Sequence, residues 1–263
     1  MLLTLCNPSR LPSPLLYLRA MNSNIDTHSE IRERIIVALD LPTREAALDA
    51  ATQIRDQVGW VKVATTLFSA TGPRIVEELR ALGLRVFLDL KFHDIPAQVL
   101  GAVRSATGSG AQLLTVHASG GRAMLAAAAE GAADSDCKVV AVTVLTSLDT
   151  NDLADIGVAD TPQVQVPRLA RLAFESGVHG IVCSPKELDA LRPELPSPFI
   201  MVTPGIRPAG AQTDDQKRIM TPSDAIRAGA DYLVIGRPIL KAPNPNEAAQ
   251  QIVDSVVKDL SEA

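Results

Sequence analysis

The stretch that decides the fold of this chain is Arg85-Val86-Phe87-Leu88-Asp89-Leu90-Lys91-Phe92-His93-Asp94-Ile95-Pro96. Side chains of a strand alternate between its two faces, so Leu88, Leu90 and Phe92 point one way and Asp89 with Lys91 point the other. Pro96 then suits the first turn of a helix. A buried strand with charges on one face, followed at once by a helix, is typical of a repeated β/α architecture with a polar centre.

Seven further short, β-branched runs alternate with helical patterns along the chain, which indicates a parallel sheet. The eight runs are Arg34–Asp40, Gly59–Thr65, Arg85–Phe92, Leu113–Ser119, Lys138–Leu145, Gly180–Ser184, Phe199–Ile206 and Tyr232–Arg237. Between them, apolar residues recur at helical spacing, as in Ile75, Val76 and Leu79. Eight units without a linker predict a single-domain α/β fold, the closed (β/α)8 TIM barrel, over residues 31–263.

Residues 1–30 differ in character and predict a disordered extension, since Pro8, Pro12 and Pro14 interrupt a stretch without a signal-peptide apolar core. Met21 is an alternative start of translation that the sequence leaves open. Three scattered cysteines, Cys6, Cys137 and Cys183, favour a reducing compartment over a disulfide framework, and we expect a cytoplasmic protein.

The composition narrows the possible partners. A formal charge of −5 and only one Trp, two Tyr and five Phe argue against a nucleic-acid surface. No apolar run approaches the roughly 20 residues that cross a bilayer, so we expect no membrane partner. A small-molecule ligand is the remaining expectation.

Each apolar run tends to end in a polar or ionisable residue, and in a β/α barrel these ends meet at one mouth where ligands bind. The residues concerned are Asp40, Lys62, Asp89, Lys91, His117, Thr143, Thr146, Ser184, Thr203, Arg207 and Arg237. Their positions predict a single pocket assembled from distant segments.

Asp89 and Lys91 are the most informative of these residues, because each favours the ionised form of the other in a buried site. An ammonium held in this way can deliver a proton. A buried ion pair that only closes the barrel explains the same two residues equally well. Asp94 also fits a helix-capping carboxylate, and His93 fits a structural histidine.

Seven motifs together resemble the bacterial orotidine 5'-phosphate decarboxylase family. They run in the family's order from Arg34 to the C-terminal helix, and they include Val37-Ala38-Leu39-Asp40, Lys62-Val63, Asp89-x-Lys91-x-x-Asp94, Val116-His117-Ala118-Ser119-Gly120-Gly121, Val142-Thr143-Val144-Leu145-Thr146-Ser147, Val202-Thr203-Pro204-Gly205-Ile206-Arg207 and Val234-Ile235-Gly236-Arg237-Pro238. The resemblance implies a carboxy-lyase that makes UMP and CO2 from orotidine 5'-phosphate, the last step of de novo pyrimidine synthesis, without a cofactor or metal.

The resemblance also implies a role for each matched residue. The catalytic positions are Lys91, Asp89, Asp94 and Lys62, with Lys91 as the proton donor. Asp40 and Lys62 match contacts to the ribose hydroxyls, Thr146 a contact to the pyrimidine, and Arg207, Gln216, Gly236 and Arg237 positions that hold chiefly the phosphate. Ile95 and Pro204 complete the implied substrate-binding set. Asp94 is implied to reach the neighbouring subunit's site, which makes a homodimer the expected assembly.

For single residues, simpler explanations compete. Asp40 fits a helix cap before Pro42, Lys62 a barrel-edge lysine with its charge in water, Gly236 an ordinary turn, and Arg207 a solvated loop charge. The chain departs from the family at Ala64-Thr65-Thr66, where Gly-Lys-Glu or similar is usual, and this puts the local loop conformation in doubt.

Two other function classes remain as alternatives. A metal-dependent barrel decarboxylase or epimerase for sugar phosphates would use Asp89, Asp94 and His117 around the ion. A non-catalytic nucleotide-binding barrel would keep Arg237 but has no need for Asp89 beside Lys91. Sensitivity to chelators separates the first alternative from the decarboxylase, and loss of turnover in Lys91→Ala separates the second.

Overall fold

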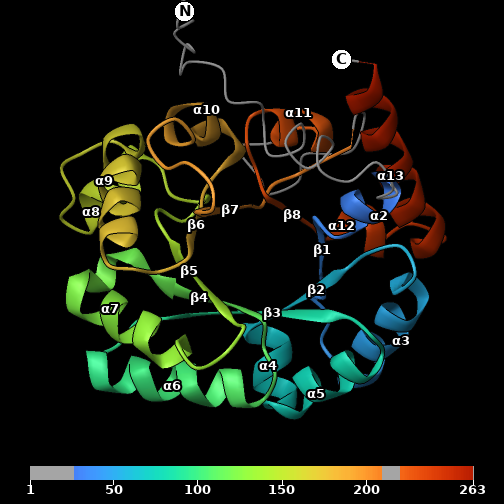
Figure 1. The fold of residues 1–263 in the computed structure, drawn as a ribbon, viewed down its shortest axis with the longest axis horizontal. Helices are drawn as coiled ribbons and strands as arrows, with labels where there is room; N and C mark the ends of the chain where they lie inside the picture. The colour runs from blue at the N-terminus through green and yellow to red at the C-terminus, as the bar shows by residue number, and fades with distance from the viewer. Residues whose placement is uncertain (1–26, 209–219, 263) are drawn as a thin grey trace, which may run out of the picture.

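The chain folds into a closed parallel barrel of eight strands in sequence order, surrounded by helices (Figure 1). The computed structural model describes residues 27–208 and 220–262. The strands are β1 (Ile35–Ala38), β2 (Trp60–Ala64), β3 (Arg85–Phe92), β4 (Leu113–His117), β5 (Lys138–Val142), β6 (Gly180–Val182), β7 (Ile200–Thr203) and β8 (Tyr232–Ile235). The predicted (β/α)8 fold is therefore confirmed.

Helices connect consecutive strands and form the outer layer of the barrel (Figure 1). They are α2 (Thr27–Arg32), α3 (Arg44–Ile54), α4 (Thr65–Thr71), α5 (Arg74–Ala81), α6 (Pro96–Gly108), α7 (Gly121–Ala132), α8 (Thr150–Asp155), α9 (Pro162–Glu175), α10 (Leu188–Leu191), α11 (Pro222–Arg227), α12 (Arg237–Leu240) and α13 (Pro245–Ser261), with 3-10 turns at Ala118–Gly120 and Pro185–Glu187. Among the described residues, no helix is long and apolar enough to cross a membrane.

Two apolar layers hold the barrel together. The larger lies between strands and helices and contains the buried stripe of α5, Ile75, Val76 and Leu79, as the spacing predicts. The smaller lies inside the barrel, where Ile36, Trp60, Phe87, Leu113, Val140, Val202 and Val234 pack together. The inner layer fills the interior of the barrel at the amino ends of the strands, which leaves room for a ligand cavity inside the barrel toward their carboxyl ends.

The predicted boundary at residue 30 lies inside a helix, because Thr27–Arg32 form α2. This helix is tied to the C-terminal α13 by His28 and Asp254, whose Nε2 and Oδ1 atoms are 3.3 Å apart, and Ile31 is fully buried. Residues 27–30, which the sequence assigned to the extension, are therefore part of this helix. Residues 1–26 lie outside the described part of the chain.

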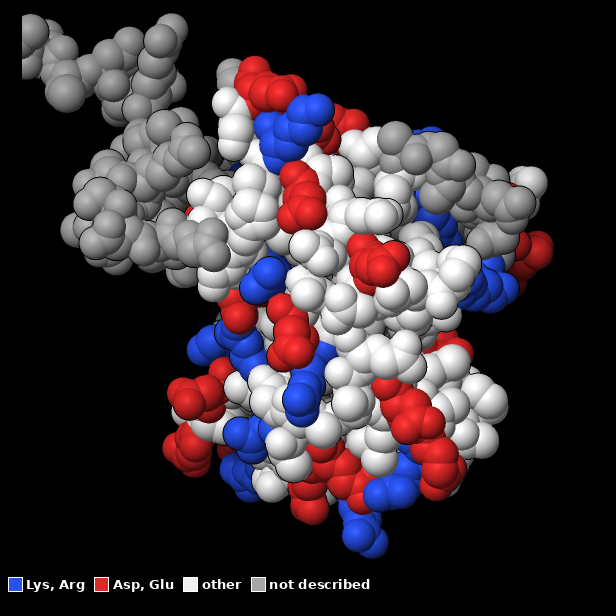
Figure 2. Space-filling view, turned by 90° about the vertical axis from the view of Figure 1, so that its right-hand side faces the viewer, with Lys and Arg blue, Asp and Glu red and all other residues white. Residues whose placement is uncertain are grey.

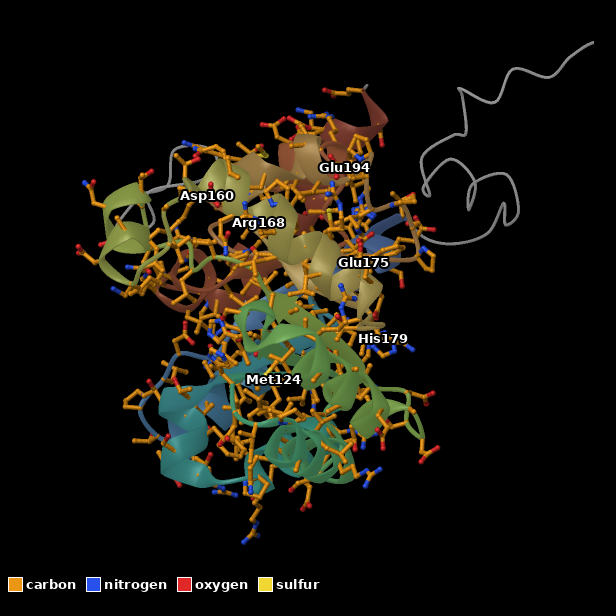
Figure 3. The ribbon with its side chains drawn as sticks, turned by 90° about the vertical axis from the view of Figure 1, so that its left-hand side faces the viewer. Met124, Asp160, Arg168, Glu175, His179 and Glu194 are labelled. Atoms are coloured by element: carbon orange, nitrogen blue, oxygen red, sulfur yellow. The ribbon has the colours of Figure 1, made fainter. Side chains whose placement is uncertain are left out.

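The outer surface carries exposed charges of both signs. On the face that carries α3 and α13, basic and acidic side chains are interspersed among uncharged ones (Figure 2). On the opposite side, the exposed face of α9 is joined to its surroundings by the ion pairs of Arg168 with Asp160, Arg122 with Glu175 and Arg171 with Glu194 (Figure 3). Such exposed pairs contribute about 1 kcal/mol or less each, so apolar packing dominates the stability of the helical layer.

Candidate active site

The inward faces of three neighbouring strands change from apolar to polar toward their carboxyl ends. Along each strand toward its carboxyl end, Trp60 is followed by Lys62 in β2, Phe87 by Asp89 in β3, and Leu113 by Thr115 in β4. Because side chains on one face recur every second residue, each polar group stands directly above an apolar one. The sequence thereby builds an apolar floor with charged groups on top of it.

A cavity of about 310 Å³ opens above this floor, within the usual range for small-ligand sites. The residues of its lining that we predicted as site residues are Asp40, Lys62, Asp89, Lys91, Thr146, Pro204, Arg207, Gly236 and Arg237. They come from six different β/α units, and closure of the barrel brings them together. Apolar neighbours including Leu41, Val144 and Leu240 complete the wall, and Lys241 adds a cation that the sequence patterns did not indicate.

Four charged side chains form an alternating row along one wall of the cavity. Lys62 Nζ lies 3.1 Å from Asp40 Oδ1 and 3.4 Å from Asp89 Oδ2, and Lys91 Nζ lies 2.8 Å from Asp89 Oδ1. The side chains of Lys62 and Asp89 are 10% and 12% exposed, whereas those of Lys91 and Asp40 are 33% and 63% exposed. The row therefore runs from solvent at Asp40 through a buried centre to an ammonium that faces the cavity.

Asp89 is the buried centre of this row. Burial acts to raise the pKa of its carboxyl group, but the charges of Lys62 and Lys91, with hydrogen bonds from Lys91 and Thr115, outweigh burial and hold the pKa below its usual value. Asp89 is thus an anion at neutral pH, and it keeps two cations in place beside the cavity.

Thr115 belongs to this group, although sequence reasoning did not single it out. It is fully buried, and its hydroxyl donates to Asp89 Oδ1 at 2.9 Å. The signal that would have found it is its position between Leu113 and His117, where an apolar strand carries a polar residue on its inward face.

Two arginines and a glycine from the ends of β7 and β8 also line the cavity. Arg207 is only 6% exposed, and its Nη1 donates to the carbonyl of Ile206 at 3.0 Å, so the interpretation as a solvated loop charge is wrong. Gly236 directly precedes the half-buried Arg237, the first residue of α12, and a Cβ atom there would meet Ala38 Cβ at 3.5 Å. Two guanidinium groups and a backbone without a side chain suit an anion such as a phosphate.

The simpler explanations for the first two strands also fail. The helix after β1 is capped by Thr43, which accepts from Ala46 N at 3.2 Å, so Asp40 is not its cap. Lys62 is buried and paired on both sides, and it does not extend its charge into water. At the unusual Ala64-Thr65-Thr66 segment, β2 passes directly into α4 at Thr65.

Asp94 and Ile95 do not line the cavity of this subunit. Both are exposed, Ile95 by 64%, and the Asp94 carboxylate accepts a hydrogen bond from Ile95 N at 2.7 Å. Helix α6 begins one residue later with Ile95 at its N-cap, so Asp94 is not the N-cap residue itself. The sequence also predicts a loop over the phosphate within Pro208–Ile219, where Gly210, Asp214 and Asp215 suggest mobility. Apart from Pro208 this segment, with Gln216, lies outside the described residues.

Two histidines lie next to the charged row. The rings of His93 and His117 are 5.4 Å apart, and the pKa of His117 is lowered by burial and by the charges of His93 and Lys91, against the effect of Asp89. Within residues 27–208 and 220–262, no three His, Cys, Asp or Glu side chains form a group that could hold a metal ion.

Comparison with known protein families and sequences gives one consistent result. Residues 33–252 match the family described as orotidine 5'-phosphate decarboxylase / HUMPS. An orotidine 5'-phosphate decarboxylase from Anaeromyxobacter sp. (strain K) is 52% identical over 220 residues, which cover 84% of this chain and 96% of the relative. The enzyme of that name from Nitrosospira multiformis is 49% identical over 212 residues, covering 81% of this chain and 89% of the relative.

Two solved structures with the same architecture carry the same name. The crystal structure of orotidine 5'-phosphate decarboxylase from Lactobacillus acidophilus superimposes with a TM-score of 0.77 at 34% identity, covering 85% of this chain and 99% of that one. The one from Pyrococcus horikoshii OT3 gives a TM-score of 0.68 at 28% identity, covering 84% and 98%. The similarity spans nearly the whole barrel and nearly the whole of each relative.

Proposed function

Because the chain belongs to the orotidine 5'-phosphate decarboxylase / HUMPS family, we propose that it converts orotidine 5'-phosphate to UMP and CO2. The observation that carries this proposal is the alternating row Asp40, Lys62, Asp89 and Lys91 along a cavity that also bears two arginines. A non-catalytic binding barrel has no use for such a row, because burying charges costs free energy.

The reaction needs a cation at the carbon that loses the carboxyl group. When the bond between C6 and the carboxylate breaks, its electron pair stays on C6, and CO2 leaves as a neutral molecule. The Lys91 ammonium, fixed at 2.8 Å from Asp89, stabilises this pair and then transfers a proton to C6. The product is UMP, and the neutral amine regains its proton from solvent. The chemistry requires no electron sink beyond these side chains.

Asp89 has two effects in this mechanism. It holds the ammonium groups of Lys62 and Lys91 in place before the substrate arrives, so no reorganisation is needed during the reaction. It also lies beside the departing carboxylate, and their repulsion disappears as neutral CO2 forms. The first effect is the larger, because preorganised stabilisation of the developing charge is usually the largest single contribution to catalysis.

The remaining cavity residues are proposed to hold the parts of the substrate that do not react. Arg207, Gly236 and Arg237 suit the phosphate, Thr146 and Pro204 the pyrimidine ring, and Asp40 with Lys62 the ribose hydroxyls. Reactions this difficult need barrier reductions on the order of 20 kcal/mol, more than one contact supplies. Binding energy from the phosphate therefore helps to force the ring against Asp89 and Lys91.

The proposed assembly is a homodimer in the cytoplasm. Asp94 and Ile95 are exposed next to the mouth-forming end of β3, which agrees with a role in a neighbouring subunit's site and not in their own. Gln216 is proposed to contact the ligand as well. No cofactor enters the proposed mechanism.

The test is a spectrophotometric assay with orotidine 5'-phosphate on the wild type and on Lys91→Ala. We expect Lys91→Ala to abolish turnover, because the proposed proton donor is gone. The variant should still bind UMP, because UMP has no carboxylate at C6 and the other cavity residues are proposed to hold the rest of the molecule. Lys138→Ala is a matched control and should keep full activity. Lys138 is exposed and is the first residue of β5, at the end of the barrel away from the cavity. Substantial turnover by Lys91→Ala would refute the role of Lys91.

Chelation separates the proposal from the metal-dependent alternative. EDTA should leave the wild-type rate unchanged. The two ammonium groups on Asp89 argue against a metal there, because they occupy the oxygens that a cation would need. Activity lost to EDTA and restored by Mg²⁺ would favour a sugar-phosphate decarboxylase or epimerase instead.

A further inference from the structure

Strand β3 leaves regular strand geometry at the residue proposed to donate the proton. Lys91 has a φ of 52°, and it is the one non-glycine residue with positive φ in the described part of the chain. The pairing of β3 with β4 is also interrupted between Leu88 and Phe92. A left-handed conformation costs a lysine about 1–2 kcal/mol, so the surrounding structure must hold it there.

The side chain of Thr115 supplies the contact that this irregular backbone lacks. Lys91 N donates to Thr115 Oγ1 at 2.8 Å, where a regular ladder would offer a backbone carbonyl of β4. The same hydroxyl donates to Asp89 Oδ1 at 2.9 Å, and that oxygen accepts from Lys91 Nζ at 2.8 Å. The three residues close a ring of hydrogen bonds that joins the backbone of Lys91 to its own ammonium group.

We propose that Thr115 is a positioning residue that fixes the strained backbone of Lys91 and thereby aims its ammonium group along the cavity wall. This inference rests on the proposed function. Thr115 is fully buried and is not part of the cavity lining, so it acts through Asp89 and Lys91 and not on the substrate.

The direction of the hydrogen bonds explains why a hydroxyl is needed at this position. The Lys91 N–H group can only donate, so the hydroxyl accepts from it and its single proton is left for Asp89. Asp89 Oδ1 must then be an unprotonated acceptor. Valine has the shape of threonine but can neither accept from Lys91 nor donate to Asp89, and it would leave a buried N–H group unsatisfied.

The test compares Thr115→Val and Thr115→Ser with a matched control, Thr143→Val. The strand-end pattern put Thr143 among the predicted pocket residues, but in the structure it is buried and does not line the cavity. Its hydroxyl donates to Val182 O at 3.1 Å and not to a member of the charged row. We expect Thr115→Val to lower kcat on the order of 100-fold, as displacements of a reacting group by about 1 Å do. Its affinity for UMP should change less than about 3-fold, and Thr115→Ser and Thr143→Val should keep kcat within about the same factor.

The pH dependence of kcat separates a positioning role from a loss of protein stability, because a less stable fold alone would not shift the profile. Loss of the Thr115 hydrogen bond removes one of the contacts that lower the pKa of Asp89. The acid limb of the kcat profile should therefore move to higher pH in Thr115→Val and stay in place in Thr143→Val. If Thr115→Val does not fold, Thr115→Ala carries the same expectations.

Each outcome bears on one hypothesis. Wild-type activity in Thr115→Val, or equal losses in Thr115→Val and Thr143→Val, would overturn the positioning role and leave the proposed function intact. A wild-type protein without any decarboxylation of orotidine 5'-phosphate would instead refute the proposed function. A loss confined to kcat, with serine restoring it, supports the positioning role.

Discussion

Replacement of Lys62 by methionine tests whether the charged row holds the upper barrel together. Methionine keeps most of the volume and removes the positive charge between Asp40 and Asp89. Lys62 is 8% exposed, so water cannot easily replace its contacts. Asp89 would keep Lys91 and Thr115 as partners but lose its second cation.

The expected loss can be worked from the distances. At an effective dielectric constant of about 20, the 3.4 Å between Lys62 Nζ and Asp89 Oδ2 corresponds to roughly 5 kcal/mol of attraction. The bond to Asp40 adds little, because the Asp40 side chain is 63% exposed. Desolvation of Lys62 and its repulsion from Lys91 offset about half of the attraction. We therefore expect a net loss of about 2–3 kcal/mol in the free energy of unfolding.

Thermal and urea denaturation of the ligand-free protein measure this loss. A loss of this size should lower the Tm by about 5–10 °C in a chain of this length. Ligands must be absent, since anything that binds only the folded state raises the Tm. Lys138→Met is the control, because it removes an exposed lysine and should change stability by less than about 0.5 kcal/mol.

A double-mutant cycle with Asp89→Asn isolates the interaction itself. If the attraction is real, the two changes together should cost at least about 1.5 kcal/mol less than the sum of the single changes. Additive effects, or a Tm of Lys62→Met within about 2 °C of the wild type, would refute the electrostatic argument.

Two further predictions concern other parts of the barrel. The pKa of His179 is lowered by burial and by Lys138, and its Nδ1 accepts from Val139 N at 3.1 Å at the closed end of the barrel (Figure 3). The unfolded chain then binds a proton more readily than the folded one, so stability is lost as pH falls below about 6.5. Denaturation between pH 7.5 and 5.5 should show a shallower decline in His179→Asn, whose amide oxygen keeps the acceptor; an unchanged slope would contradict the assignment. At the open end, Arg237→Met should lower kcat/KM for orotidine 5'-phosphate by about 10- to 100-fold through loss of charge-assisted hydrogen bonds. An equal loss with a substrate lacking the phosphate would show that Arg237 acts elsewhere.

Much of the fold follows from local patterns in the sequence. The eight apolar runs and the stripe of α5 all appear in the structure, and β3 has its predicted bounds. Gly83 and Gly229 follow helical patterns in the sequence, where a glycine suits a C-terminal cap, and they have φ of 86° and 104° just after α5 and α11. The other strands are shorter than predicted at their carboxyl ends, because the last residues of each run leave the ladder and enter the loops or helices that follow, as Thr65 enters α4 and Arg237 enters α12.

Period-two alternation was also sufficient to place Asp89 beside Lys91, since both lie on one strand. Contacts between strands could not be predicted in this way. Lys62 lies between Asp40 and Asp89 only because β1, β2 and β3 pair in one register, in which Ala38 faces Lys62 and Ala64 faces Asp89. Register depends on the closure of the whole barrel, and no local pattern encodes it.

The sequence by itself therefore determined which residues face the centre of the barrel and which of them carry charge. Only the tertiary structure decided that Arg207 is buried, that Lys91 takes a left-handed backbone, and that Thr115 joins it to Asp89. The physical reason is range: side-chain alternation is a property of neighbouring residues, whereas burial and hydrogen bonds across strands depend on segments that are far apart in the chain.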